Sequence, residues 1–316
     1  MGGAKFDSAL RFAPLYQTRV WGGRGFASFL GRDLPQGCAI GESWEAVDRT
    51  EAQSVVASGP WTGVTLHALW TEHRLEVFGS SWPVSPRFPL LLKLLDARET
   101  LSLQVHPSDA ACAQRLGESK TEWWYVLDAA PEASVFAGFR PGVDRSMVEG
   151  ALMTGAFEPL LHKIPVRKGD SLFVPAGRIH AIGAGCLIAE VQQNSDTTFR
   201  VFDWNRKGAD GVPRELHLDQ SLACINFEDF SPSLSADLRE QGFSCDFFSI
   251  SGIALAGVGT AEGLGGSFFF VAEGAVQVGL DLFHRGDWFL LPAQAGSISL
   301  SPETEGTFLV RVAASR

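Results

Sequence analysis

The sequence has few cysteines, with five in 316 residues and no CxxC pair among them. Their odd number and wide spacing favour buried thiols in a reducing compartment over a disulfide framework or a zinc site built from cysteine. Long apolar runs are also absent. The longest candidate, at 88–97, is interrupted by Lys93, whereas a membrane-spanning helix needs about 18 apolar residues or more. We therefore expect no transmembrane helix.

Positive charge is scarce as well, since 26 Lys and Arg residues stand against 36 Asp and Glu residues, a net charge of −10. A balance of this sign disfavours nucleic acid as a partner. An anionic small molecule would need a local cluster of Lys and Arg, because the overall field repels it. The N-terminal residues lack the apolar core of a secretory signal, and we expect a soluble, cytoplasmic protein.

Glycine, in contrast, is abundant, with 34 residues, and it separates short apolar or aromatic-rich runs. Runs of this length between turn residues predict β-strands arranged as packed sheets or barrels. Helical patterns are few, and they fall at 65–79, 107–118 and 218–229. The first of them begins with a Thr that can cap a helix and ends in Gly. The sequence thus predicts an all-β protein with a few short helices.

An internal repeat divides the strand-rich part of the chain into two barrel-like units. The segment KGDSLFVPAGRIHAIGAG at 168–185 aligns without a gap with RGDWFLLPAQAGSISLSP at 285–302. Each copy contains a Gly-Asp turn, then a strand, then a Pro where the strand ends. Upstream, EWWYVLDAA at 122–130 can be aligned with SFFFVAEGA at 267–275. The repeat therefore predicts that one barrel fold occurs twice.

The two copies differ where chemistry would take place. His180 of the first copy aligns with Ser297 of the second, and Glu122 aligns with Ser267. A barrel core does not need such polar residues in one copy alone. His180 and Glu122 are therefore candidate functional residues, and the second barrel is expected to be degenerate.

The repeat and the helical patterns together predict a domain organisation. We expect an N-terminal segment at 1–87 that packs on a catalytic, metal-binding barrel at 88–217. A helical connection at 218–239 would then lead to a degenerate barrel without metal at 240–316. The sequence does not predict an oligomeric state.

Alternation of side chains along two strands brings further polar residues to the inner face of the first barrel. Ser102, Gln104 and His106 share one face of a strand, and Lys120 and Glu122 share one face of the next. Polar groups inside a small barrel are costly unless something binds them. Two imidazoles, a carboxylate and an amide oxygen suit a divalent transition metal such as zinc. The predicted metal ligands are Gln104, His106, Glu122 and His180.

The other histidines of the sequence are not predicted to bind a metal. A single His on a strand is more often hydrogen-bonded within the fold than bound to a metal. We expect the five remaining histidines to be hydrogen-bonded in this way. They are His67, His73, His162, His217 and His284.

Six segments resemble, in the expected order, the type I phosphomannose isomerases. They are RVWGG at 19–23, GESWEAVD at 41–48, QVHPSD at 104–109, KTEWWYVL at 120–127, FVPAGRIHAIGAG at 173–185 and EVQQNSDTTFRVFDWNR at 190–206. The resemblance implies a cupin fold with two jelly-roll units and the interconversion of mannose 6-phosphate and fructose 6-phosphate. It also implies one zinc ion, held by Gln104, His106, Glu122 and His180.

The same resemblance implies roles for further residues. It assigns active-site roles to Lys120, Glu190 and Arg200. Trp21 and Glu42 match positions near the pocket mouth, and Ser102 matches a position near the substrate phosphate. The residues implied to bind substrate are thus Trp21, Glu42, Ser102, Lys120 and Arg200.

Some alternatives stay open at the level of the sequence. The general base is Lys120, Glu190 or a metal-bound water. Two His and one carboxylate also form the iron site of non-haem cupin oxygenases, and a non-catalytic sugar-phosphate-binding cupin would keep the same pocket. The Gln104 oxygen and the cationic pair Lys120 and Arg200 favour the isomerase over the oxygenase.

Overall fold

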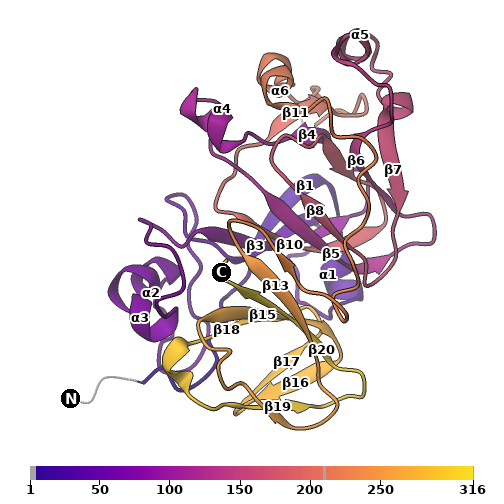
Figure 1. The fold of residues 1–316 in the computed structure, drawn as a ribbon. Coiled ribbons are helices and arrows are strands. Elements are labelled where there is room, and N and C mark those ends of the chain that lie inside the picture. Colours follow the sequence, from indigo (N-terminus) through magenta and orange to yellow (C-terminus); the bar gives the residue numbers. More distant parts are fainter. Residues whose placement is uncertain (1–4, 209–210, 316) are drawn as a thin grey trace. The chain divides into compact units, whose positions relative to one another are not determined.

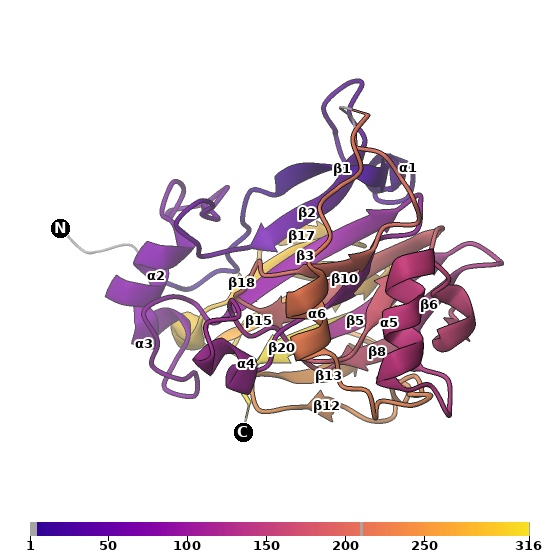
Figure 2. The ribbon, with the colours of Figure 1, turned by 90° about the horizontal axis from the view of Figure 1, so that it is seen from above.

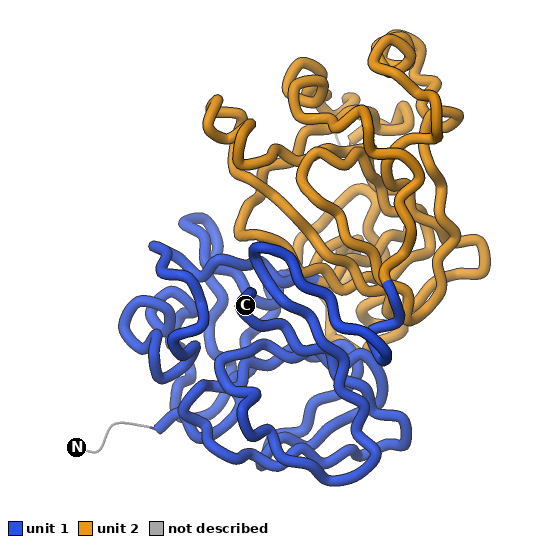
Figure 3. The backbone as a smooth tube through the Cα atoms, viewed as in Figure 1, with its two compact units in different colours: residues 1–15, 44–93, 236–316 blue, residues 16–43, 94–235 orange. Residues whose placement is uncertain are grey.

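The chain forms two compact units in a computed structural model that describes residues 5–208 and 211–315 (Figure 3). Unit 1 comprises the residues up to 15, together with 44–93 and those from 236 onward. Unit 2 comprises 16–43 and 94–235. Strands outnumber helices in both units (Figure 1), which confirms the predicted mainly-β class. The domain boundaries predicted from the sequence, at residues 88, 218 and 240, stay predictions.

Two sheets that lie largely within unit 2 make up the first jelly roll. One sheet has the order β1-β2-β3-β10-β5-β8, with β1 at Leu15–Gly23, β2 at Ile40–Ala46, β3 at Leu90–Ala97, β10 at Cys186–Gln193, β5 at Glu122–Ala129 and β8 at Ser171–Val174. The other has the order β11-β4-β9-β6-β7, with β11 at Phe199–Phe202, β4 at Leu103–Val105, β9 at His180–Ile182, β6 at Ser134–Phe139 and β7 at Leu161–Pro165.

The core of this jelly roll lies between its two sheets. Val126, Val174 and Ile188 of the first sheet pack with Val135 and Ile182 of the second in one buried cluster. Residues that alternate with these on the second sheet face outward, where a separate apolar cluster is covered by α5 (Arg145–Thr154) and α6 (Leu218–Cys224) (Figures 1 and 2). Strands β6, β7 and β9 therefore pack on both faces, whereas β4 and β11 contribute apolar residues to the outer cluster alone.

Unit 1 contains the second jelly roll. One sheet has the order β12-β13-β20-β15-β18, with β12 at Phe243–Ser244, β13 at Ser249–Ala254, β20 at Phe308–Ala313, β15 at Ser267–Glu273 and β18 at Trp288–Leu291. The other has the order β14-β19-β16-β17, with β14 at Gly259–Thr260, β19 at Ser299–Pro302, β16 at Ala275–Val278 and β17 at Asp281–His284. Its interior is mainly aliphatic and also contains Phe269, Phe283 and Phe289.

Strand order and register confirm the internal repeat. The run β10-β5-β8 of unit 2 corresponds to β20-β15-β18 of unit 1, and β4-β9-β6-β7 corresponds to β14-β19-β16-β17. Glu122 is the cross-strand partner of Val174, and Ser267 is the cross-strand partner of Leu291. The sequence alignment equates these same positions, so a metal-ligand candidate in one barrel occupies the place of a serine in the other.

The Gly-Asp turn before β8 and β18 also repeats in atomic detail. The Asp170 carboxylate accepts a hydrogen bond from the Arg167 amide at 2.8 Å, and Asp287 accepts one from the His284 amide at 2.9 Å. The preceding glycines have φ values of 93° and 90°, a region that favours glycine. The turn motif therefore begins the same strand in both units.

The predicted helices are present but shorter. The first is split into α2 (Leu66–Glu72) and α3 (Arg74–Val77), and the Thr65 hydroxyl caps α2 by accepting from the Ala68 amide at 3.1 Å. The second is α4 (Asp109–Ala113), and the third is α6. Elements that were not predicted are α1 (Gly25–Ser28), α5, and the 3₁₀ turns η1 (Glu158–Leu160) and η2 (Ala293–Ala295). Within the described residues, no helix has the length and apolar character needed to cross a membrane.

The interior of unit 2 can be tested with Ile188→Ala. Ile188 has no exposed surface, and truncation of a buried Ile costs about 2–5 kcal/mol because it leaves a cavity. We expect the urea midpoint of unfolding to fall accordingly. Met153, which is 88% exposed, provides the control, because Met153→Ala should change stability by no more than about 0.5 kcal/mol. Equal stability of the two variants would contradict this assignment of the core.

Candidate metal centre and active site

The predicted metal ligands come from strands of both sheets of unit 2. Gln104 on β4 is the direct cross-strand partner of His180 on β9, and side chains of such partners lie on the same face. His106 follows directly after β4, and Glu122 is the first residue of β5 in the facing sheet. The jelly roll thus brings three distant parts of the sequence to one end of its interior.

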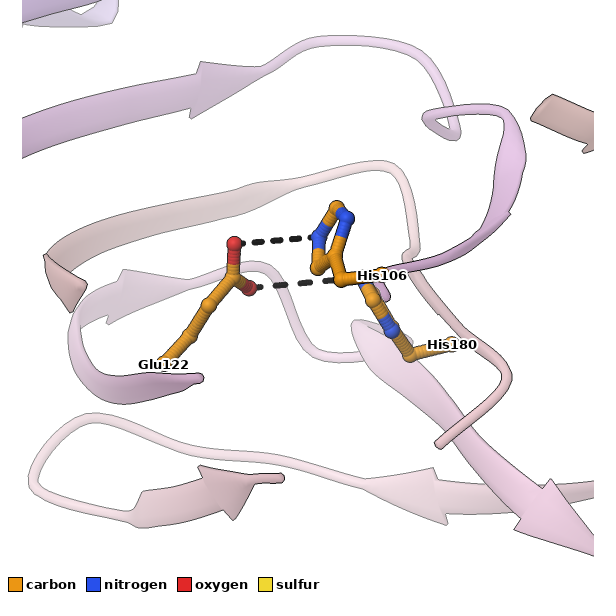
Figure 4. Close-up of side chains that lie close together, drawn as sticks. All are labelled: His106, Glu122 and His180. Carbon is orange, nitrogen blue, oxygen red and sulfur yellow. Dashed lines mark ion pairs between the residues drawn. The ribbon is translucent and has the colours of Figure 1, made fainter. Parts of the chain in front are cut away.

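His106, Glu122 and His180 lie close together and are all buried (Figure 4). His106 Nε2 is 3.1 Å from Glu122 Oε1, and His180 Nε2 is 4.0 Å from Glu122 Oε2. The two imidazole centroids are 4.7 Å apart. One donor atom from each residue lies within 4.8 Å of the others. These separations are close to those of donors that share one ion with bonds of about 2.0–2.2 Å.

The electrostatic setting keeps both imidazoles neutral and the carboxylate ionised. Burial, together with the charge of Lys120, lowers the pKa of His106 to about 3, and burial also lowers the pKa of His180. Burial alone would raise the pKa of Glu122, but Lys120 and His106 outweigh it and hold that pKa well below its usual range. These are the protonation states in which the three residues bind a metal.

The hydrogen bonds of the two histidines also fit a metal ion. His180 Nδ1 donates to the Arg178 carbonyl at 2.8 Å, which leaves the Nε2 lone pair free on the side of Glu122. Among the described residues, neither ring nitrogen of His106 forms a well-aligned hydrogen bond, although both are buried and Nε2 lies 3.1 Å from the Glu122 carboxylate. Buried polar atoms are rarely unsatisfied, and a bound ion would satisfy this ring. The donor set therefore fits a divalent metal.

Gln104 and Ser102 form a pair beside these three residues. Gln104 Nε2 donates to the Ser102 hydroxyl at 3.0 Å, and Ser102 is buried. Because the nitrogen of the amide is bound in this way, its oxygen is the end that is left to bind a cation. Gln104 lies on the same face as His180, and its role as a metal ligand stays a prediction.

Lys120 and Glu190 adjoin the group through different contacts. Lys120 Nζ is 3.0 Å from Glu122 Oε1. Trp124 Nε1 donates to Glu122 Oε2 and to Glu190 Oε2, both at 3.0 Å. Trp124 had no predicted role, although the alternation that selects Glu122 also places Trp124 on the inner face. Its indole joins the two carboxylates into one network.

Gln192 on β10 is a further polar residue of this region that sequence reasoning missed. It is the cross-strand partner of Glu122 and is fully buried. Its amide donates to the carbonyls of Gln193 and Ser195 at 2.9 and 2.6 Å, which fixes the chain after β10. The spacing of two residues from Glu190 is the signal that could have identified it.

Arg200 lies on β11 at the edge of the second sheet. It is the cross-strand partner of Gln104, so its side chain lies on the same face as the metal-ligand candidates. Its Nη1 donates to the Glu215 carbonyl at 2.7 Å, and its backbone N–H donates to His217 Nδ1 at 3.0 Å. Its buried Nε has no hydrogen-bond partner among the described residues.

Asp203, an acidic residue whose charge acts on Arg200, is already neutralised by other cations. Asp203 is bound by Arg206 at 2.7 Å and by two nitrogens of Arg214 at 2.7 and 2.6 Å. Burial and the charge of Arg214 lower the pKa of Arg200. Within the described residues, no carboxylate forms an ion pair with Arg200. Its positive charge is therefore available to an anionic ligand.

Trp21 and Glu42 lie on β1 and β2. Trp21 is buried in the apolar cluster between the sheets. The Glu42 carboxylate accepts from Arg19 Nε at 2.8 Å and Nη2 at 3.1 Å. In the sheet, β3 and β10 stand between β2, which carries Glu42, and β5, which carries Glu122. The roles of Trp21 and Glu42 at the pocket mouth stay predictions.

Comparisons with known proteins find relatives over nearly the whole chain. The sequence model of the type I phosphomannose isomerase catalytic domain matches residues 9–137. A mannose-6-phosphate isomerase of Bacillus subtilis (strain 168) is 36% identical over 315 residues, which cover 94% of this chain and 96% of that protein. A mannose-6-phosphate isomerase of Streptococcus mutans is 37% identical over 287 residues, which cover 87% of this chain and 89% of that protein. The crystal structure of a mannose 6-phosphate isomerase from Bacillus subtilis matches with a TM-score of 0.85 at 30% identity, over 96% of this chain and 99% of that one.

Proposed function

Because this chain belongs to the type I phosphomannose isomerases, we propose that it interconverts mannose 6-phosphate and fructose 6-phosphate at the metal centre of unit 2. The observation that carries the proposal is the joint burial of His106, Glu122 and His180 inside one barrel. The other barrel has Ser267 and Ser297 at the aligned positions. Such an aldose–ketose isomerase moves a proton between neighbouring carbons of the sugar through an enediol.

The proposed metal is one zinc ion. Neutral imidazoles, a carboxylate and an amide oxygen form a mixed nitrogen and oxygen donor set that suits zinc. When bound, the ion polarises the carbonyl and hydroxyl oxygens of the sugar, an effect worth several kcal/mol of charge stabilisation. The proposed ligands are Gln104, His106, Glu122 and His180.

Lys120 and Glu190 are the side chains proposed to exchange a proton with the sugar. Lys120 contacts Glu122 directly, and Glu190 contacts it through the Trp124 indole. A base within hydrogen-bond reach of the reacting carbon contributes about 10²–10⁴-fold to the rate. The burial of both residues excludes water from the place where the proton moves.

Arg200 and Lys120 are proposed to hold the phosphorylated substrate. Arg200 faces the metal-ligand side of the sheet, and its charge is not neutralised by a carboxylate within the described residues. A phosphate that does not react still contributes binding energy, and this energy positions the reacting carbons. The remaining residues proposed to contact substrate are Trp21, Glu42 and Ser102.

A coupled assay for fructose 6-phosphate formation from mannose 6-phosphate tests this function. We expect turnover by the purified protein, loss of nearly all of it after treatment with a chelator, and its return when zinc is added. Full turnover by protein shown to be free of metal would contradict the role of the ion. A zinc-loaded protein without turnover would contradict the isomerase, and oxygen consumption by an iron-loaded protein would favour the oxygenase.

A further inference from the structure

The turn 175–178 contacts both of the proposed histidine ligands. The Gly177 N–H donates to the backbone carbonyl of His106 at 2.9 Å. The Arg178 carbonyl accepts the Nδ1 proton of His180 at 2.8 Å. One turn therefore fixes the backbone of the first histidine and the ring orientation of the second.

The turn itself packs against the segment that follows α6. Gly177 has a φ of +86°, and a Cβ atom there would lie 3.2 Å from the Cys224 carbonyl oxygen. The Asn226 N–H donates to the Gly177 carbonyl at 2.8 Å. Only glycine combines this backbone conformation with so close an approach at little cost. The turn is thus held against the chain at 224–226.

A bidentate ion pair fastens the other end of the turn. Arg178 Nε lies 2.7 Å and Nη2 lies 2.8 Å from the two carboxylate oxygens of Asp229, and Nη1 donates to the Phe173 carbonyl at 2.6 Å. The side chains of Arg178 and Asp229 are only 12% and 13% exposed. Paired charge-assisted hydrogen bonds of this kind fix geometry as well as distance. Asp229 is therefore connected to His180 through Arg178 alone.

The segment around α6 that contacts the turn also contacts the Arg200 backbone, through His217. His217 directly precedes α6, and its Nδ1 accepts from the Arg200 N–H at 3.0 Å. The His217 N–H in turn donates to the Arg200 carbonyl at 2.8 Å. His217 is thus bound twice to the backbone from which the Arg200 guanidinium extends.

We propose that residues 217–229 form a brace that positions the metal centre and the substrate cation relative to each other. Asp229 acts through Arg178 on the two histidines, and His217 acts through β11 on Arg200. Both are positioning residues, since neither contacts the proposed ion or the reacting atoms. The arm through His217 rests on the proposed function, whereas the arm through Asp229 can be measured by metal binding alone.

The arm through Asp229 is tested with Asp229→Asn, which keeps the size of the side chain and removes its charge. Loss of partners that orient a metal ligand typically costs about 10–100-fold in metal affinity. We expect the zinc affinity, measured by competition with a chelator at a temperature where the metal-free variant is fully folded, to fall by about that factor. Arg178→Lys should have an intermediate effect, because Lys keeps the charge but not the planar fork.

The matched control for this arm is Glu149→Gln, which breaks the exposed Arg145–Glu149 ion pair of 2.8 Å in the same unit. It should leave zinc affinity unchanged. Wild-type zinc affinity in folded Asp229→Asn would overturn the proposal, as would a lower unfolding temperature of the metal-free protein with unchanged affinity. If Asp229→Asn does not fold, Arg178→Lys is measured in its place and is interpreted by the same criteria.

The arm through His217 is tested with His217→Phe, which removes the acceptor and keeps an aromatic ring beside Phe199. Loss of one hydrogen bond that positions Arg200 should raise KM for mannose 6-phosphate by about 2- to 10-fold. Zinc affinity should stay at the wild-type value, in contrast to Asp229→Asn. An unchanged KM would overturn this arm. If the wild-type protein has no isomerase activity, the proposed function fails, yet the zinc measurements still decide the arm through Asp229.

Discussion

Replacement of His106 by Ala is expected to remove most of the bound metal and nearly all turnover. His106 is buried, its ring nitrogens have no other partner among the described residues, and its Nε2 lies 3.1 Å from Glu122. Loss of a residue that only orients a ligand costs about 10–100-fold in affinity, and loss of a ligand itself should cost more. Metal content by elemental analysis and kcat in the coupled assay measure the two effects.

His162→Ala provides the control for this experiment. His162 lies on β7 of the same unit and is partly exposed, so we expect wild-type metal content and a kcat close to that of the wild type. A His106→Ala protein that keeps one zinc per chain would contradict the proposed ligand set. A protein that keeps zinc but loses turnover would instead make His106 a catalytic group that does not bind the ion.

The fold could be predicted from the sequence because its signals are local and occur twice. The Gly-Asp turn, the strand and the closing Pro repeat in both barrels, and the Asp170 and Asp287 carboxylates make the same backbone contact. Helix α5 was missed even though Asp144 caps its start and Gly155 ends it with a φ of +74°. Its exposed Met147 and Met153 weaken the apolar pattern that a helix prediction needs.

The grouping of His106, Glu122 and His180 could be predicted for a similar reason, since the repeat and the alternation along single strands select these residues. The contacts between strands could not be predicted. The Trp124 indole joins Glu122 to Glu190 only because β10 lies beside β5, and strand order is a property of the tertiary fold. No local pattern near Asp229 or His217 indicates that Asp229 pairs with Arg178 or that His217 binds the Arg200 backbone.

Arg200→Lys is expected to keep the fold and the metal while kcat/KM falls by about 10- to 100-fold. Lys keeps the positive charge but cannot reproduce the planar pair of donors that guanidinium offers to a phosphate or oxyanion. Loss of one charge-assisted contact costs about 1.5–3 kcal/mol, and each 1.36 kcal/mol corresponds to a factor of ten in rate. Steady-state kinetics with mannose 6-phosphate, alongside metal analysis, provide the measurement.

The control for Arg200→Lys is Arg167→Lys, because the side chain of Arg167 is 90% exposed and belongs to a turn of the same unit. It should have wild-type kinetics. Wild-type kinetics in Arg200→Lys would show that the fork of Arg200 makes no specific contact with the substrate. Lys120, in contact with Glu122, would then remain as the proposed substrate cation. With a single cation to attract the phosphate, in a chain with a net charge of −10, KM should then rise less steeply with ionic strength than with two cations in place.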